Sequence, residues 1–234
     1  MDELENYELG IDEAHLSHMA DFWKLVSVMD RAGLLERVVP VFGAAEYLLT
    51  RACRFGMIRP LLVPYTVEFL MPDPFTPLSG EAADCSGLGR ILTARNIMDD
   101  SRSFIFESQL TVEFVAASEL VGRRRAVDSV LGFPLRTIPH TRFLLADLIK
   151  ARIGGYVFSL PSPEAYIVAH MVDWDNHIYP ADAPDPMIRL WRKLDLDKLA
   201  DIIAGLDTYE YRQVRDFLKY RRMKFSLPER RPDA

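Results

Sequence analysis

The sequence predicts a mixed α/β (α+β) protein in which a mixed sheet is flanked by helices and followed by a helical C-terminal subdomain. The chain has 234 residues, 49% of them hydrophobic and 26% charged, which suffices for one sizeable core or two small ones. Short apolar runs of strand length are interspersed with helix-like patterns up to about residue 160, and only helix-like patterns follow. We therefore expect an N-terminal helical segment over residues 1–36, an α/β core over 37–160 and a helical subdomain over 161–234.

The charge and the cysteine content exclude several classes of protein. A formal net charge of −6 argues against a molecule that binds nucleic acid or an anionic membrane with its whole surface, so nucleic acid is not expected as the main partner. A local basic patch stays open. Cys53 and Cys85 are far apart and form no CxxC motif, which is typical of reduced thiols. No apolar run approaches the roughly 18 residues of a membrane span, so we expect a cytoplasmic protein without a membrane partner.

The first two predicted elements are a helix and a strand that leads into a second helix. Apolar positions recur every three or four residues from 12 to 33, which predicts an amphipathic helix. His15 and His18 share one face of it, either as metal ligands or, in the interpretation we favour, as part of an exposed polar face. Residues 38–42 predict a short buried strand and 43–45 a tight turn into a helix over 46–55. Small residues at such a turn let the backbone approach an anion, although packing alone also explains them.

Two later strands each carry one acid among apolar neighbours. Residues 65–72 form an apolar run around Glu68 and end at prolines that cannot continue a ladder. Residues 110–115 repeat the same Val-Glu-Phe trio around Glu113. An acid in a half-buried strand is costly unless it is paired or functional, and two such strands could bring two carboxylates together. The alternative is that both glutamates face water from edge strands.

The remaining elements are mostly helical. The run Gly122-Arg123-Arg124-Arg125 predicts either a solvated basic turn or a phosphate contact. Residues 140–153 have a helical pattern, 156–160 predict a strand, and Ser162-Pro163 is a typical helix start. A loop with Asp173, Asp175 and His177 predicts a solvated turn, with a metal site as the alternative. Further helices are expected over 186–205 and 207–222.

The order of these parts resembles the nucleotidyltransferase superfamily, with its polymerase-β-like fold, and within it the small bacterial nucleotidyltransferase-like proteins that include toxin and antitoxin relatives. The resemblance rests on the turn Phe42-Gly43-Ala44-Ala45, on the strand from Thr66 to Pro72 in the place of the Asp-x-Asp strand, and on Val112-Glu113-Phe114 in the place of the third acid. Thr66 stands where the first acid of the pair is usual. Ala169-His170 stands where relatives often carry His-Lys.

The resemblance implies a site for Mg²⁺ and a nucleoside triphosphate. Glu68 and Glu113 would hold Mg²⁺ with help from the Thr66 hydroxyl, because Mg²⁺ prefers oxygen ligands. The residues that it implies for the phosphates are Gly43, Ala44, Arg123, Arg124, Arg125 and His170. One hypothesis is an enzyme that transfers a nucleotidyl group from an NTP to a hydroxyl of a protein, an RNA or a small molecule. The second is a catalytically degenerate fold that serves as a binding, antitoxin-like or regulatory module for a protein partner or a second copy. The third, which the overall acidity disfavours, is RNA binding through the basic tail over residues 219–231.

Overall fold

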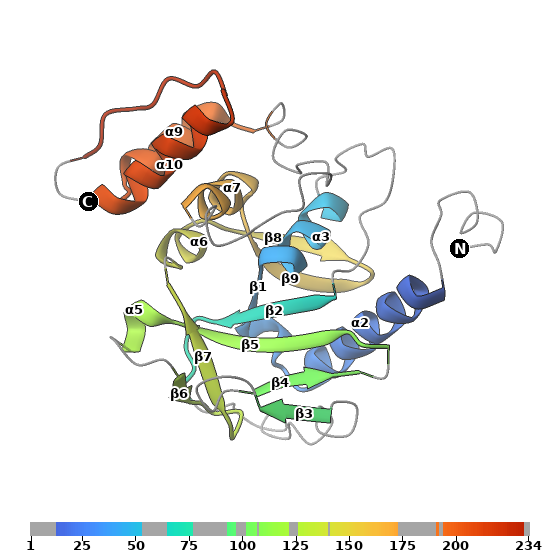
Figure 1. Cartoon of the computed structure of the whole chain (residues 1–234). Coiled ribbons are helices and arrows are strands. Elements are labelled where there is room, and N and C mark those ends of the chain that lie inside the picture. Colours follow the sequence, from blue (N-terminus) through green and yellow to red (C-terminus); the bar gives the residue numbers. More distant parts are fainter. Residues whose placement is uncertain are drawn as a thin grey trace. The chain divides into compact units, whose positions relative to one another are not determined.

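The computed structural model describes residues 13–52, 65–76, 93–96, 102–106, 108–121, 126–139, 141–172, 191 and 194–231. Their fold is mixed α/β, as the sequence predicts (Figure 1). The chain separates into two compact units. The first contains the described residues up to 139 together with 149–160, and the second contains 141–148 and those from 161 onward. The domain limits expected from the sequence, at residues 36 and 160, stay predictions.

The first unit is built on a mixed sheet, which the described residues form with seven strands. The strands are β1 (Val39–Val41), β2 (Thr66–Met71), β3 (Thr93–Asn96), β4 (Arg102–Ile105), β5 (Thr111–Ala117), β6 (Ala126–Asp128) and β7 (Pro134–Ile138). Five of them lie in the order β1-β2-β5-β4-β3, while β7 pairs with β5 and also with β6. Strand β5 runs parallel to both β2 and β7, and the other pairs are antiparallel. The two strands that carry the glutamates are therefore direct neighbours inside the sheet.

Phenylalanine rings cover one face of this sheet. Phe69 of β2 and Phe114 of β5 are register partners, and their ring centroids lie 5.8 Å apart. Phe104 and Phe133 add rings whose centroids both lie 6.3 Å from that of Phe114. Phe69 and Phe114 are at most 1% exposed. Because successive side chains of a strand point to opposite faces, Glu68 and Glu113 lie on the other face of the sheet.

Helices α2 (Glu13–Arg31) and α3 (Phe42–Ala52) share an aromatic core with a hairpin of β8 (Leu148–Ile153) and β9 (Tyr156–Pro161). The Phe22 ring of α2 lies 5.4 Å from that of Tyr47, and Trp23 lies 6.3 Å from Phe158. The helix predicted over 140–153 is wrong except for one turn, α6 (Arg142–Ala146). Gly154 and Gly155 both adopt positive φ, as a two-residue hairpin turn requires, so the residues before them pair as a strand.

The described part of the second unit is helical. Besides α6 it contains α7 (Pro163–Val172), α9 (Leu196–Ala204) and α10 (Thr208–Tyr220). The predicted start of α7 is confirmed, since the Ser162 hydroxyl accepts a hydrogen bond of 3.1 Å from the Ala165 amide. Asp207 is the N-cap residue of α10 and forms a capping box with Glu210. None of the helices in the described ranges has both the length and the hydrophobicity that crossing a membrane requires.

Candidate functional site

Glu68 and Glu113 lie side by side on the face opposite the phenylalanine rings. They are register partners on the parallel strands β2 and β5, so their side chains leave the sheet on the same face. Each side chain is only 15% exposed. The alternative of two edge-strand glutamates that face water is therefore wrong, because both strands have neighbours on either side and both side chains are mostly covered.

Arg136 of β7 holds the two carboxylates together. It pairs in register with Val115, two residues beyond Glu113 on the same face of β5. Its Nη2 atom lies 2.6 Å from Glu68 Oε1 and 2.9 Å from Glu113 Oε2, and its Nε atom lies 3.3 Å from the same Glu113 oxygen. The arginine side chain is 37% exposed, so the cluster is half-open to solvent. The two acids therefore converge on one cation, and that cation is a side chain of the protein itself.

In this arrangement the two carboxylates are engaged by Arg136 and are not open to the Mg²⁺ ion that the resemblance implies. An octahedral Mg²⁺ ion needs oxygen ligands at about 2.0–2.1 Å and usually keeps several waters. Here a guanidinium lies within hydrogen-bonding distance of one oxygen of each glutamate, in the space between the two carboxylates. Within the described ranges, no three His, Cys, Asp or Glu side chains are grouped so that they could hold a metal ion.

Gly43 and Ala44 belong to the helix rather than to a turn before it. Helix α3 begins at Phe42, directly after β1, so the predicted start at residue 46 is too late. Val41 pairs with Glu68, which places the beginning of α3 next to the carboxylate cluster. Phe42 itself has a φ of 48°, a conformation that costs a residue with a bulky side chain roughly 1–3 kcal/mol. The first turn of α3 is therefore held in a strained geometry beside Glu68.

Of the other predicted site residues, Thr66 and His170 lie within the described ranges. Thr66 is exposed at the start of β2, two residues before Glu68 and on the same face. His170 lies on α7 in the second unit, where its ring centroid is 6.2 Å from that of Phe217. Arg123, Arg124 and Arg125 lie outside the described residues, as does the predicted loop with Asp173, Asp175 and His177.

His18 does not belong to an exposed polar face. It is 1% exposed and lies edge-on to Tyr65, with ring centroids 4.8 Å apart. Its Nε2 atom forms a hydrogen bond with the backbone carbonyl of Ser108. The interpretation as a solvated histidine is therefore wrong, because the side chain is buried against Tyr65 and the Ser108 backbone. Its contacts are those of a packed core histidine.

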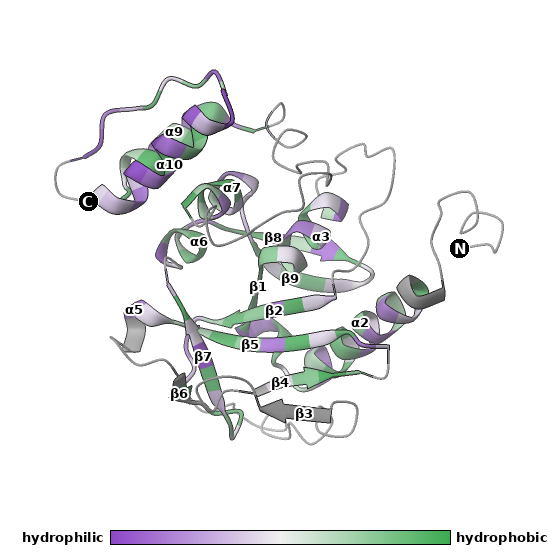
Figure 2. Ribbon diagram, viewed as in Figure 1, coloured by the Kyte–Doolittle hydropathy of each residue, from purple (hydrophilic) through white to green (hydrophobic). Residues whose placement is uncertain are grey.

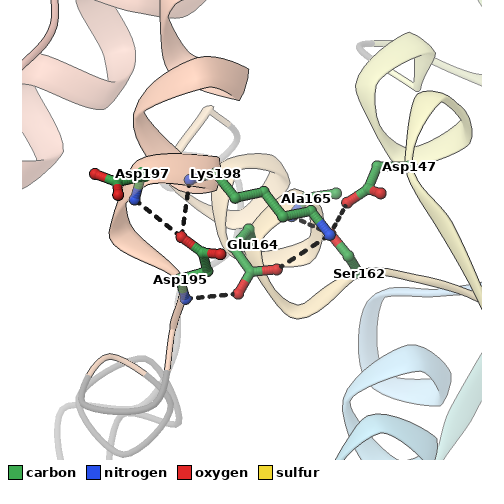
Figure 3. Close-up of polar contacts among 7 residues, drawn as sticks. All are labelled: Asp147, Ser162, Glu164, Ala165, Asp195, Asp197 and Lys198. Atoms are coloured by element: carbon green, nitrogen blue, oxygen red, sulfur yellow. Dashed lines mark hydrogen bonds and ion pairs between the residues drawn. The ribbon is translucent and has the colours of Figure 1, made fainter.

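A second charged cluster lies within the helical unit, around Lys198 of α9 (Figure 3). The lysine Nζ atom lies 2.8 Å from Asp147 Oδ2 and 3.7 Å from Glu164 Oε2. Glu164 Oε1 also accepts a hydrogen bond of 3.0 Å from the Asp195 amide at the start of α9. Burial opposes the ionisation of Asp147, but its hydrogen bonds to Lys198 and Ser162 and the lysine charge hold its pKa below the ordinary value. The hydrogen bond to Asp147 raises the pKa of Lys198.

We expect Lys198→Met to destabilise the protein by about 1–3 kcal/mol at pH 7, because it leaves Glu164, which is mostly buried, and Asp147 without their cation. The pKa of Asp147 is lowered from 3.8, so this contribution is complete above that pH and disappears as the pH falls below it. The pKa of Lys198 is raised from 10.5, so the loss at the alkaline end begins only above that pH.

Urea denaturation at pH 7, 5 and 3 measures this contribution. The difference between wild type and Lys198→Met should shrink from pH 5 to pH 3. Lys219→Met, at an exposed position of α10, is the matched control and should change the stability by less than about 0.5 kcal/mol. A difference that stays constant down to pH 3 would contradict the role assigned to Asp147.

Comparison with known proteins finds no relative: no protein-family model, curated protein or solved structure matches the chain. We therefore infer a function from the residues of the first unit. Neither Arg136 nor Lys198, the two cations that organise the charged clusters, is among the site residues predicted from the sequence.

Proposed function

We propose that this protein is a catalytically degenerate, nucleotidyltransferase-like binding module, in which an internal arginine takes the place of the catalytic metal. One observation carries the proposal: a single nitrogen of Arg136 contacts both Glu68 and Glu113. Two half-buried carboxylates on adjacent strands repel each other unless a cation lies between them. In this chain the Arg136 guanidinium supplies that charge, so Glu68 and Glu113 need no divalent ion between them.

Two further features support a module without catalysis. Thr66, in the place of the first acid, offers a neutral hydroxyl, which is a weaker ligand for a divalent cation than a carboxylate. The first turn of α3, with Phe42, Gly43 and Ala44, carries no charged side chain that could hold a triphosphate. The partner of such a module would be a protein or a second copy of the chain.

Nucleotidyl transfer is the second candidate, and a specific observation favours it. Glu68 and Glu113 lie in register on parallel strands and converge on one point, which is the placement that a shared metal requires. For this candidate Arg136 would have to leave the carboxylates when Mg²⁺ and a nucleotide bind.

Thermal unfolding with and without 10 mM MgCl₂ distinguishes the two candidates. We expect no Mg²⁺-dependent stabilisation of the wild type, and no transfer of label from radiolabelled NTPs to the protein or to added RNA. Arg136→Met should gain a Mg²⁺-dependent stabilisation of about 1.4 kcal/mol, since a ligand present at roughly ten times its Kd stabilises by this amount. The double variant Arg136→Met/Glu68→Gln should lose that gain.

Mg²⁺-dependent stabilisation of the wild type that disappears in Glu68→Gln would overturn the proposal in favour of the enzyme. Label transfer that needs both Glu68 and Glu113 would do the same. The double variant is the essential control, because it shows whether the ion binds between the carboxylates or elsewhere on an acidic protein.

A further inference from the structure

The exposed residues of α10 after Thr208, and those of the turn that follows the helix, are basic residues and tyrosines. Between 209 and 222, every exposed residue is one or the other. The inner side of α10 is buried through Glu210, Val214, Phe217 and Leu218. Figure 2 shows strongly hydrophilic segments along α9 and α10. We call this surface the basic–tyrosine face; its members are Tyr209, Arg212, Arg215, Lys219, Tyr220, Arg221 and Arg222.

Helical spacing places three of the basic side chains in one line along α10. Arg212, Arg215 and Lys219 follow one another at intervals of three and four residues, so they form one stripe along the helix. Tyr209 and Tyr220 lie on the neighbouring side of the helix, in line with Gln213 and Asp216, and their separation of eleven residues at 1.5 Å per residue is about 16 Å. Their exposed fractions are 55% and 67%. The cationic stripe thus has two exposed aromatic rings beside it, and Asp216 lies between those rings along the helix.

Positive charge on this face is only partly balanced. Asp216 is the one acid of this segment beside the stripe, and it is shared by Arg212, at 3.8 Å, and Arg215, at 3.1 Å. The other acid between 209 and 222 is Glu210, which is buried and paired with Arg142 at 2.7 Å. The chain as a whole has a formal charge of −6. Within residues 209–222, however, five basic residues outnumber two acids, a local excess that the total charge conceals.

We propose that the basic–tyrosine face binds single-stranded nucleic acid. Arg212, Arg215 and Lys219 would contact successive phosphates, and Tyr209 and Tyr220 would stack on bases. A cationic stripe combined with exposed aromatic rings is the arrangement by which proteins hold single strands without reading their sequence. An acidic protein would match the cations alone, whereas a single strand would also use the faces of the two exposed rings; Tyr209 accepts a hydrogen bond of 2.7 Å from Gln213 through its hydroxyl, and the Tyr220 ring centroid lies 5.9 Å from the Arg221 guanidinium carbon. The inference goes beyond the proposed function and does not depend on the carboxylate cluster.

Fluorescence anisotropy of the full chain with labelled 20-nucleotide single-stranded RNA and DNA tests this inference. Three to five phosphate contacts predict an affinity that falls about 20- to 100-fold between 50 and 200 mM NaCl. Arg212→Gln/Arg215→Gln/Lys219→Gln should weaken binding at 50 mM NaCl at least about tenfold and reduce the salt dependence by roughly two ion equivalents. Tyr220→Ala should weaken binding at least about fivefold with an unchanged salt dependence.

The matched control is Lys24→Gln/Arg31→Gln/Arg152→Gln, which removes the same charge from exposed positions of the first unit. It should change the affinity less than about twofold, and circular dichroism should show that both triple variants stay folded. Absence of binding at 50 mM NaCl, an equal loss in both triple variants, or a preference for duplex over single strands would overturn the inference. Salt-dependent self-association without nucleic-acid binding would also overturn it and would assign the face to a second copy.

Discussion

Phe114→Ala is expected to cost about 3–5 kcal/mol of unfolding free energy, one of the largest effects of any single substitution in the first unit. Phe114 is 1% exposed and lies in the middle of β5, between the ring of Phe69 on β2 and those of Phe104 and Phe133. Removing its ring deletes three aromatic contacts at once. It also leaves a cavity that the neighbouring strands cannot close without losing their register with β5. Urea denaturation followed by circular dichroism gives the free energy directly.

Two further variants make this prediction specific. Phe114→Leu keeps most of the volume and should cost only about 1 kcal/mol. Phe75→Ala removes the same type of side chain from a position that is 54% exposed, and it should change the stability by less than about 0.5 kcal/mol. If Phe114→Ala cost no more than Phe75→Ala, the ring cluster could not be the core of the sheet.

The strands that position the glutamates could be predicted from the sequence because their signal is local. Val67-Glu68-Phe69 and Val112-Glu113-Phe114 each alternate one acid with buried neighbours, and that alternation persists in the structure. Their pairing is not local, since β2 and β5 are separated by two strands of the same sheet in the chain order. The repeated trio predicted that the acids could meet. It did not predict which cation lies between them.

The sequence analysis did not identify Arg136 as a site residue, although its local sequence pattern resembles that of the two glutamates. It is the one charged residue in the run Phe-Pro-Leu-Arg-Thr-Ile over residues 133–138, just as each glutamate is the one acid in its own run. A half-buried cation in a strand calls for acids on the same face of a neighbouring strand. Only the two registers of β5 show that these acids are Glu113, two residues before the partner of Arg136, and Glu68, which is the partner of Glu113 on β2.

The helix over 140–153 was mispredicted for a different reason. Leu144, Leu145 and Ile149 fit a helical period, but the hairpin turn at Gly154 and Gly155 draws the preceding residues into β8. The Gly154 backbone also lies against the Trp23 ring of α2, where an added Cβ would be 3.1 Å from the nearest ring atom. Tertiary packing therefore overrides the local pattern at this point, as it often does for short apolar runs.

Arg136→Met is expected to cost about 2–3 kcal/mol at pH 7, less than for a fully buried ion pair because the arginine is 37% exposed. The methionine keeps most of the aliphatic stem and removes only the charge and the hydrogen bonds. Glu68 and Glu113, each 15% exposed, then remain as adjacent carboxylates without a cation between them. Chemical denaturation without divalent ions measures the loss.

The triple variant Arg136→Met/Glu68→Gln/Glu113→Gln separates charge from packing. Neutral amides no longer repel each other and can hydrogen-bond across the two strands, so most of the lost stability should return. Glu68→Gln alone should cost less than Arg136→Met, because Arg136 keeps Glu113 as its partner. Were the triple variant as unstable as Arg136→Met, the loss would come from packing around the arginine stem. The guanidinium would then not be the cation that stabilises the pair, and the central argument for a built-in replacement of the metal would fail.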